Sequence, residues 1–267
     1  MKHSKARFSS VTSVVYPLLF GVLLIALWQG QILHKLLHTT TLILPLPTRI
    51  LSVIADNLPA IAQDAWATLS VILPGLVLGS IIGYLLAVFA TNSPRFGATG
   101  LTIIAAVSAI PTVALAAVVL QWTRDVSTDV NVRSYVMKLV IVTVVSVASM
   151  TLNAYRGLTE LKPFAMDLMK SYAANKRTVL FKLRAPNSLP YIFTSLKVSV
   201  PACVIAALVS EYFAEKITGV GRRIRECILQ AQYSTAWAYI VTACVIGIVL
   251  FAILMASEKL IMRKRNS

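Results

Sequence analysis

The stretch that decides the fold runs from Trp66 to Ala90 and reads WATLSVILPGLVLGSIIGYLLAVFA. It contains no Asp, Glu, Lys or Arg, and most of its residues are apolar. An α-helix rises about 1.5 Å per residue, so about 20 such residues cross the ~30 Å hydrocarbon layer of a bilayer. The stretch is therefore long enough and apolar enough for one transmembrane helix.

Five further apolar stretches flank it. They are Val14–Leu33, Leu101–Trp122, Tyr135–Tyr155, Tyr191–Phe213 and Trp237–Leu260. Hydrophobic residues make up 57% of the 267 residues and charged residues only 13%, which is too apolar for a soluble globular domain. The sequence predicts an all-α, polytopic membrane protein with six transmembrane helices, organised as a single transmembrane domain over residues 1–267.

The charges predict the orientation of these helices. The net charge is +15, but the basic residues lie between the apolar stretches and not along one face, which disfavours nucleic acid as a partner. With both termini in the cytoplasm, 16 of the 25 basic and 3 of the 10 acidic residues fall inside, giving net charges of +13 inside and +2 outside. The positive-inside rule therefore predicts an N-in, C-in topology, with membrane lipid around the spans.

Small and helix-breaking residues recur within the spans. Gly75, Gly79 and Gly83 are spaced four apart and share one helical stripe, so a neighbouring backbone can approach closely. Prolines interrupt three apolar runs, at Pro74, Pro111 and Pro201. Each frees a backbone carbonyl, which is tolerated beside a cavity and also in ordinary helix packing. We expect the glycine stripe to serve packing first.

The connection from residue 156 to residue 190 is the most informative inside segment. It combines apolar and basic residues in the manner of an amphipathic helix. Two readings fit this pattern equally: the helix docks on a partner protein, or it lies on anionic lipid headgroups.

The spacing of this connection resembles the cytoplasmic loop of binding-protein-dependent permeases. The family pattern runs Glu-Ala-Ala, three residues, Gly, nine residues, Ile, one residue, Leu-Pro. Here Asp167 begins the pattern and Ala173 stands at the glycine. Leu183 then stands at the isoleucine and Pro186 at the end, so the spacing is kept although several identities differ.

Other motifs resemble those of the nitrate, sulfonate and taurine permease group, in the same order along the chain. They are Leu44–Thr48, Ala109–Leu115, Asn153–Leu158, Pro186–Phe193, and Glu211 followed by Gly219–Gly221. The chain therefore resembles the permease subunit of a type I ATP-binding-cassette (ABC) importer.

This resemblance implies a multi-pass protein of the bacterial inner (cell) membrane. Two copies of the chain, expected as a homodimer, would enclose the pathway, with an ATPase subunit below them and an extracytoplasmic solute-binding protein above. ATP-driven closure of the ATPase would move the spans by alternating access.

No enzyme activity is expected of this chain. It has no G-x-x-x-x-G-K-[ST] stretch and no paired nucleophile and base, so ATP would be used by the partner subunit and no cofactor would be bound here. His34 and His38 have the spacing of a metal pair, but no third ligand lies nearby, so no metal site is expected.

Two groups of residues are predicted to act in transport. The resemblance assigns ATPase coupling to Asp167, Tyr172, Ala173, Lys176, Arg177, Leu180, Phe181, Leu183 and Pro186. Phe181, Leu180 and Tyr172 are the preferred apolar anchors. The translocation pathway is assigned to polar or bent positions of the inner spans, namely Ser108, Pro111, Thr112, Asn153, Ser199, Ser210 and Glu211. An interfacial, snorkelling carboxylate is the other reading of Glu211.

The sequence disfavours two other functional classes. A secondary transporter independent of an ATPase would show more midplane charges and often an inverted repeat, and a membrane enzyme would need a reactive cluster. The sequence displays none of these. The scarcity of basic residues within the spans favours a small heterocyclic solute, such as a vitamin precursor, over a sulfonate, taurine or a nitrate-like anion.

Overall fold

The computed structural model describes residues 2–216 and 218–266, and the side chains of residues 15–93, 97, 99–216 and 218–263. Every regular element within these ranges is a helix. In chain order they are α1 (Lys2–Gln29), α2 (Ile32–Leu36), α3 (Pro47–Asp56), α4 (Leu58–Asn92), α5 (Pro94–Ser108), α6 (Thr112–Thr123), α7 (Val130–Thr159), α8 (Ala165–Ser171), α9 (Lys176–Val179), the π-helical turn η1 (Leu180–Arg184), α10 (Ala185–Phe213), α11 (Val220–Leu229) and α12 (Tyr233–Asn266).

Four helices among the described residues are long and apolar enough to cross a membrane. They are α4, α7, α12 and the continuous helix Lys176–Phe213, which joins α9, η1 and α10. Helices α5 and α6 together pass the same test as one span that is bent by 94°. The predicted first span falls on α1, whose described apolar part, Val15–Gln29, is shorter. The structure therefore supports four crossing helices, or five with the bent pair, and does not confirm the sixth.

The predicted span from Leu101 to Trp122 is broken at Pro111. Helix α5 ends at Ser108, and α6 begins at Thr112 after the extended residue Pro111, whose φ is −58° and ψ is 128°. A proline has no backbone N–H and disfavours helical geometry in the residue before it. The break therefore follows from Pro111.

Pro74 shows why another proline is tolerated inside a straight helix. It lies within α4 and leaves the carbonyl of Ser70, four residues earlier, without its helical donor. The hydroxyl of Tyr135 on α7 donates to that carbonyl at 3.3 Å. A neighbouring helix thus supplies the hydrogen bond that the proline removes.

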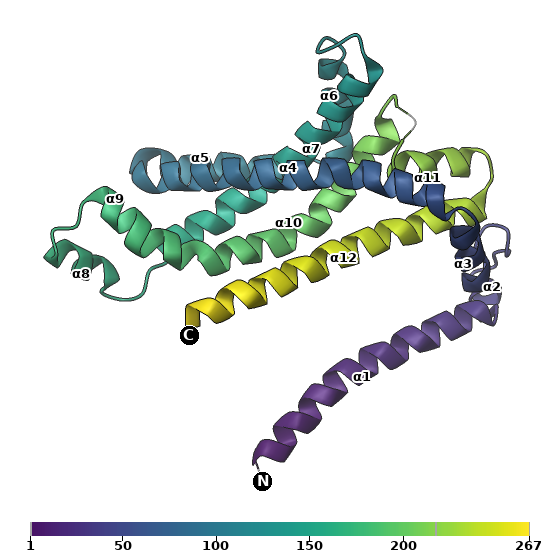
Figure 1. The fold of residues 1–267 in the computed structure, drawn as a ribbon, viewed down its shortest axis with the longest axis horizontal. Helices are drawn as coiled ribbons and strands as arrows, with labels where there is room; N and C mark the ends of the chain where they lie inside the picture. Colours follow the sequence, from purple (N-terminus) through teal and green to yellow (C-terminus); the bar gives the residue numbers. More distant parts are fainter. Residues whose placement is uncertain (1, 217, 267) are drawn as a thin grey trace.

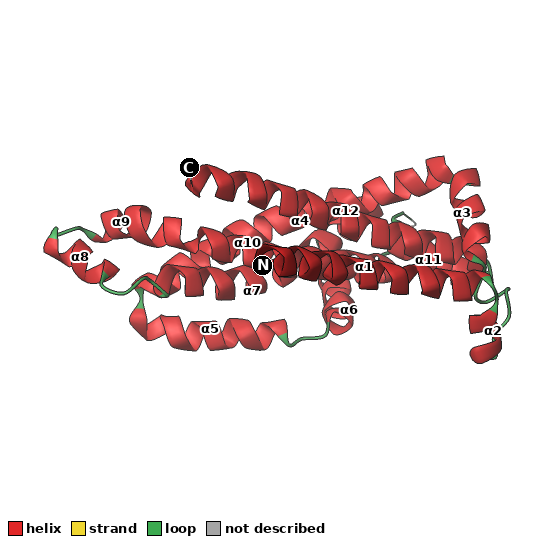
Figure 2. Ribbon diagram, turned by 90° about the horizontal axis from the view of Figure 1, so that it is seen from below, coloured by secondary structure: helices red, strands yellow, loops and turns green. Residues whose placement is uncertain are grey.

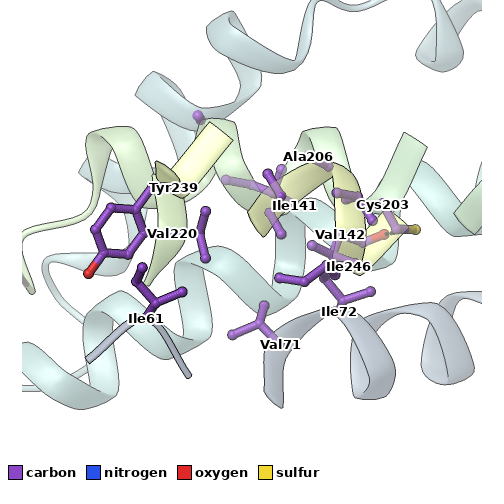
Figure 3. Packing of buried hydrophobic residues seen from close by; sticks show 14 of the residues in the cluster. Ile61, Val71, Ile72, Ile141, Val142, Cys203, Ala206, Val220, Tyr239 and Ile246 are labelled. Atoms are coloured by element: carbon purple, nitrogen blue, oxygen red, sulfur yellow. Dashed lines mark hydrogen bonds between the residues drawn. The ribbon is translucent and has the colours of Figure 1, made fainter. Parts of the chain in front are cut away.

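The centre of the molecule is formed by α4, α7 and α10. Figure 3 shows Ile72 of α4, Val142 of α7 and Cys203 of α10 within one buried cluster. The glycine stripe of α4 lies flush against α7: a Cβ on Gly79 would fall 2.5 Å from the Cβ of Ser146. The predicted packing role of the stripe is confirmed, because only glycine permits this approach.

The helices form an elongated body with two distinct ends. Figures 1 and 2 show α8 and α9 at one end and α2, α3 and α11 at the other. Helix α1 diverges from the body in Figure 1, and Trp28 near its end meets Trp237 of α12 with ring centroids 5.5 Å apart. Residues 156–190, predicted as an inside connection, are largely helical, because α7 continues to Thr159 and α10 begins at Ala185.

Candidate functional site: a groove, an outer polar network and a docking surface

A groove of about 500 Å³ lies at the broken span, between α5, α6, α7 and α10. Its polar side chains are Ser108, Thr112, Ser149 and Asn153, and the other lining residues are aliphatic. No charged side chain lines it among the described residues. Such a surface suits a neutral molecule that forms hydrogen bonds.

The broken span places polar groups at this groove. Ser108 is the last residue of α5 and Thr112 the first of α6, so both sit beside the bend. Helix ends carry backbone N–H and C=O groups without intrahelical partners. At membrane depth such backbone is tolerated where it is buried in protein or lines a water-filled cavity.

Asn153 and Ser149 complete the polar lining from α7. The Asn153 amide donates through Nδ2 to the Ser149 carbonyl at 2.9 Å, which fixes its orientation one turn along the helix. Ser149 was missed in the sequence, although it lies four residues before Asn153 and therefore on the same helical face.

The residues predicted to form the pathway fall into two sets. Ser108, Thr112 and Asn153 line the groove, and Pro111 forms the bend next to it. Three others are fully buried within the chain and do not line the groove: Ser199, Ser210 and Glu211. The Ser210 hydroxyl donates to the Ala207 carbonyl of its own helix, and the Ser199 hydroxyl has no hydrogen-bond partner in the described structure.

Glu211 belongs instead to an outer polar network near α11. Its carboxylate lies 2.9 and 3.1 Å from the Thr68 hydroxyl and accepts from the Gly221 backbone N–H at 2.8 Å. The buried cation Lys138 of α7 attracts it electrostatically. A buried carboxylate is stabilised by such donors and opposite charges.

Asp64 of α4 forms the second half of the outer polar network. Its carboxylate accepts from the Gly219 N–H at 3.1 Å, from Arg223 Nε at 3.0 Å and from the Tyr239 hydroxyl at 2.9 Å. Burial opposes the charge of the Arg223 guanidinium, but its hydrogen bond and ion pair with Asp64 leave the pKa of Arg223 raised. The network thus joins α4, α10, α11 and α12 at one end of the molecule.

The turn between α10 and α11 fits tightly around Glu211. Gly219 has φ of 103°, a conformation that favours glycine, and a Cβ there would collide with the Glu211 carboxylate. This explains why Glu211 and the Gly219–Gly221 segment occur together. Their partners Asp64 and Thr68 lie about 150 residues earlier, and no motif predicted them.

The opposite end of the molecule presents an apolar docking surface. We define it by the exposed side chains Phe164, Leu168, Tyr172 and Phe181 on and next to α8, α9 and η1, which are 83%, 57%, 77% and 70% exposed. The motif spacing begins at Asp167, so it did not predict Phe164. Large exposed apolar side chains of this kind are typical of interaction surfaces.

The predicted coupling residues lie around this docking surface. Lys176, Arg177 and Pro186 are exposed, and Asp167 is exposed and pairs with Lys170 at 3.0 Å. Leu183 is half-buried. Leu180 is also half-buried and packs on the inner cluster of Ala87, Met150, Ala154 and Leu158, so it faces the body of the protein.

Ala173, at the glycine position of the family pattern, has φ of 46°. Its N–H donates to the Lys170 carbonyl at 2.9 Å, and the Ala174 N–H donates to the Met169 carbonyl at 3.0 Å. These two bonds form a Schellman motif, which ends a helix on a left-handed residue and is most often completed by glycine. The geometry therefore explains the family's preference for glycine at this point.

His34 of the histidine pair contacts the protein backbone. His34 Nε2 lies 2.6 Å from the carbonyl oxygen of Leu44. Among the described residues no group of three His, Cys, Asp or Glu side chains is placed to hold a metal ion.

Known proteins are similar to this chain in sequence. The profile of the family described as "Binding-protein-dependent transport system inner membrane component" matches residues 75–266. The formylaminopyrimidine transport permease protein ThiX of Halalkalibacterium halodurans is 26% identical over 258 residues, which cover 94% of this chain and 96% of that protein. A probable ABC transporter permease protein of Haemophilus influenzae is 26% identical over 201 residues, covering 73% of this chain and 76% of that protein.

Solved structures share the fold. A chain of the inward-facing MetNI methionine ABC transporter aligns with a TM-score of 0.62 at 16% identity, covering 78% of this chain and 97% of that one. A chain of an amino acid ABC transporter solved with histidines aligns with a TM-score of 0.62 at 14% identity, covering 79% and 96%. Because the family match spans most of its length, the chain belongs to the binding-protein-dependent transport system inner membrane components, the permease subunits of ABC importers.

Proposed function

We propose that this permease subunit pairs with a second copy, receives solute from a soluble binding protein, and moves it by alternating access driven by a separate ATPase. The family membership supports this assignment over a secondary transporter that works without an ATPase. Hydrolysis of ATP takes place on the ATPase, and this chain binds no cofactor.

The observation that carries the proposal is the docking surface. Tyr172 and Phe181 are 77% and 70% exposed at the end of the molecule that holds α8 and α9. Lys176 and Arg177 lie at the rim of the same surface. Aromatic anchors with a polar rim are typical of a protein interface.

The groove supports the assignment of the solute pathway. In a dimer, the second copy would close it. Its neutral polar lining, with Ser108, Thr112, Ser149 and Asn153, favours an uncharged solute. A small heterocycle fits this lining, and the formylaminopyrimidine named for the relative is of that class.

We further infer six spans, with α1 as the first and the bent pair α5–α6 as the third. Both termini and the docking surface then face the cytoplasm of a bacterial cell. The end of the molecule that holds α2, α3 and α11 faces the outside of the membrane. The net charges of +13 inside and +2 outside support this orientation.

Substitutions at the docking surface test the proposal. Phe181→Asp would bury an unpaired carboxylate at the interface, whereas Phe181→Leu retains an apolar side chain and serves as the matched control. The double variant Lys176→Glu and Arg177→Glu alters only rim charges, each of which contributes below about 1 kcal/mol. The measurement is the amount of ATPase that co-purifies with each permease.

Loss of the ATPase with Phe181→Asp, and its retention with Phe181→Leu, is the expected result. The double charge reversal should reduce binding less. If charge reversal abolishes binding while Phe181→Asp retains it, the segment instead lies on anionic headgroups, and the docking proposal fails.

A further inference from the structure

The cytoplasmic ends of α7 and α10 are bonded directly to each other, although the coupling segment separates them in sequence. The Asn187 amide of α10 donates through Nδ2 to the Gly157 carbonyl at 2.8 Å and to the Glu160 carbonyl at 3.0 Å. The carbonyls at the end of a helix have no partners within it. Asn187 therefore caps α7 from a different helix.

A second contact joins the same two ends. Tyr191, one turn after Asn187, donates through its hydroxyl to Glu160 Oε2 at 2.9 Å. Gly157 lies flush against α10, and a Cβ on it would fall 2.7 Å from the Ser188 Cα and 2.8 Å from Tyr191 Cδ2. The two backbones are thus in close contact where the hydrogen bonds form. We call Gly157, Glu160, Asn187 and Tyr191 the inner clasp.

Helix α4 contacts α10 next to the inner clasp. The Tyr84 and Ser188 hydroxyls lie 3.1 Å apart, and Ser188 is fully buried. Leu180 packs on Ala87 of α4 and on Met150, Ala154 and Leu158 of α7. The inner ends of three long helices therefore converge next to the inner clasp.

The two ends of the docking surface connect to the body in different ways. Helix α9 continues through η1 into α10 as one helix, Lys176–Phe213, without a loop. On the other side, the non-helical residues 160–164 separate α7 from α8. A displacement of α9 would therefore reach α10 rigidly. It would reach α7 through the side-chain packing of α7 against α10, and at the very end of α7 through the inner clasp.

We propose that Asn187 is a positioning residue for coupling: through the inner clasp it makes α7 move with α9 and α10 when the ATPase acts on the docking surface. This inference rests on the proposed ATPase partnership. Asn187 does not touch the solute or the ATPase. It holds the ends of two spans together, so one movement of the coupling segment repositions both walls of the groove that α7 and α10 contribute.

The test follows the distance between α7 and the coupling segment during the ATPase cycle. Spin labels are placed on cysteines introduced at the exposed positions Thr159 of α7 and Lys182 of η1, after replacement of the native Cys203, Cys227 and Cys244. The full complex of permease and ATPase is measured with no nucleotide and with ATP plus vanadate. Asn187→Ala is compared with the parent.

Two variants keep the comparison specific. Asn92→Ala is the matched control, because the Asn92 amide also donates to a carbonyl at the inner end of a span, but within its own helix, at 3.0 Å from Val88. Tyr191→Phe removes only the hydroxyl bond to Glu160 and retains the ring. If Asn187→Ala does not fold, the proposal can still be tested with Tyr191→Phe. Removal of hydrogen bonds of this kind should raise the population of separated helix ends about tenfold.

In the parent and in Asn92→Ala the label distance should stay narrow and unchanged by ATP. In Asn187→Ala, and more weakly in Tyr191→Phe, it should broaden or shift when ATP is added, while the amount of bound ATPase stays the same. An unchanged narrow distance in Asn187→Ala and Tyr191→Phe would overturn the proposal. Failure of the parent to bind the ATPase would instead refute the proposed function.

Discussion

At the scale of single residues, the backbone of Ala173 carries an identifiable strain. A left-handed φ of 46° costs a non-glycine residue about 1–2 kcal/mol, which glycine avoids. We therefore expect Ala173→Gly to stabilise the permease by about 0.5–1 kcal/mol, since the greater freedom of glycine in the unfolded chain offsets part of the gain. Thermal unfolding of the purified protein measures the change.

Ala174→Gly is the matched control for this prediction, because Ala174 is adjacent in the same turn and has no left-handed φ. It should leave the melting temperature unchanged or lower it. Equal shifts in the two variants would mean that the strain at Ala173 does not contribute to stability.

Gly219 provides a residue-scale prediction in the opposite direction. Gly219→Ala places a methyl group against the Glu211 carboxylate and requires φ of 103° from a residue that avoids it. We expect a destabilisation of about 2 kcal/mol or more, seen as a lower melting temperature and a lower yield. Gly247→Ala on α12, where no atom lies within 4 Å of the added Cβ, should have little effect. Comparable losses in both variants would contradict this account.

Sequence reasoning recognised half of the outer polar network and missed the other half. Glu211 and the Gly219–Gly221 turn lie within one short segment, so their pattern was visible. Asp64 and Thr68 lie on a distant apolar span, where a single Asp and Thr carry no periodic signal. Their meeting with Glu211 depends on how α4 and α10 pack, which local sequence does not encode.

At the scale of helices, the contact between α4 and α7 depends on small residues. Gly79→Leu would push a bulky side chain into Ser146 and into the Thr143 carbonyl, 2.6 Å from the position of a Cβ. We expect the yield of folded protein and the fraction of dimer to fall together, because the two central helices would separate. Size-exclusion chromatography of the purified variant measures both. Gly247→Leu, with open space around it, should assemble normally, and normal assembly of Gly79→Leu would refute the packing role.

The long helices were predictable, but which proline breaks its span was not. Apolar runs gave the positions of α4, α7, α10 and α12 because hydrocarbon thickness fixes their length. Pro74 and Pro111 look alike in sequence, yet only Pro111 breaks its span. Tyr135 supplies a hydrogen bond at Pro74, and this contact exists only after α7 has packed on α4.

The groove shows the same limit. Ser108, Thr112, Asn153, Ser199 and Ser210 are all polar residues in apolar spans. Only the first three line the groove, because the rotation of α10 turns Ser199 and Ser210 into the packed interior. Polarity within a span thus indicated candidates but not the direction in which they point.

At the scale of the whole molecule, the orientation can be tested by cysteine labelling. In a variant without the native cysteines, a cysteine at Arg177 should react with a membrane-impermeant reagent only from the cytoplasmic side. Cysteines at Arg49 and Arg133 should react only from outside, in agreement with the charge distribution. Labelling of position 177 from outside would reverse the topology and remove the basis for docking of an ATPase.

The flush contact between α4 and α7 also bears on biogenesis. Helix α4 ends at Asn92, and α7 is complete only at Thr159, with the bent pair α5–α6 synthesised between them. At about 5–20 residues per second, a ribosome needs several seconds to make that intervening segment. During this interval the glycine stripe has no α7 to cover it and faces lipid or the insertion machinery. Membrane insertion of this chain therefore includes a delayed pairing step, at which the nascent protein is most open to a wrong helix partner.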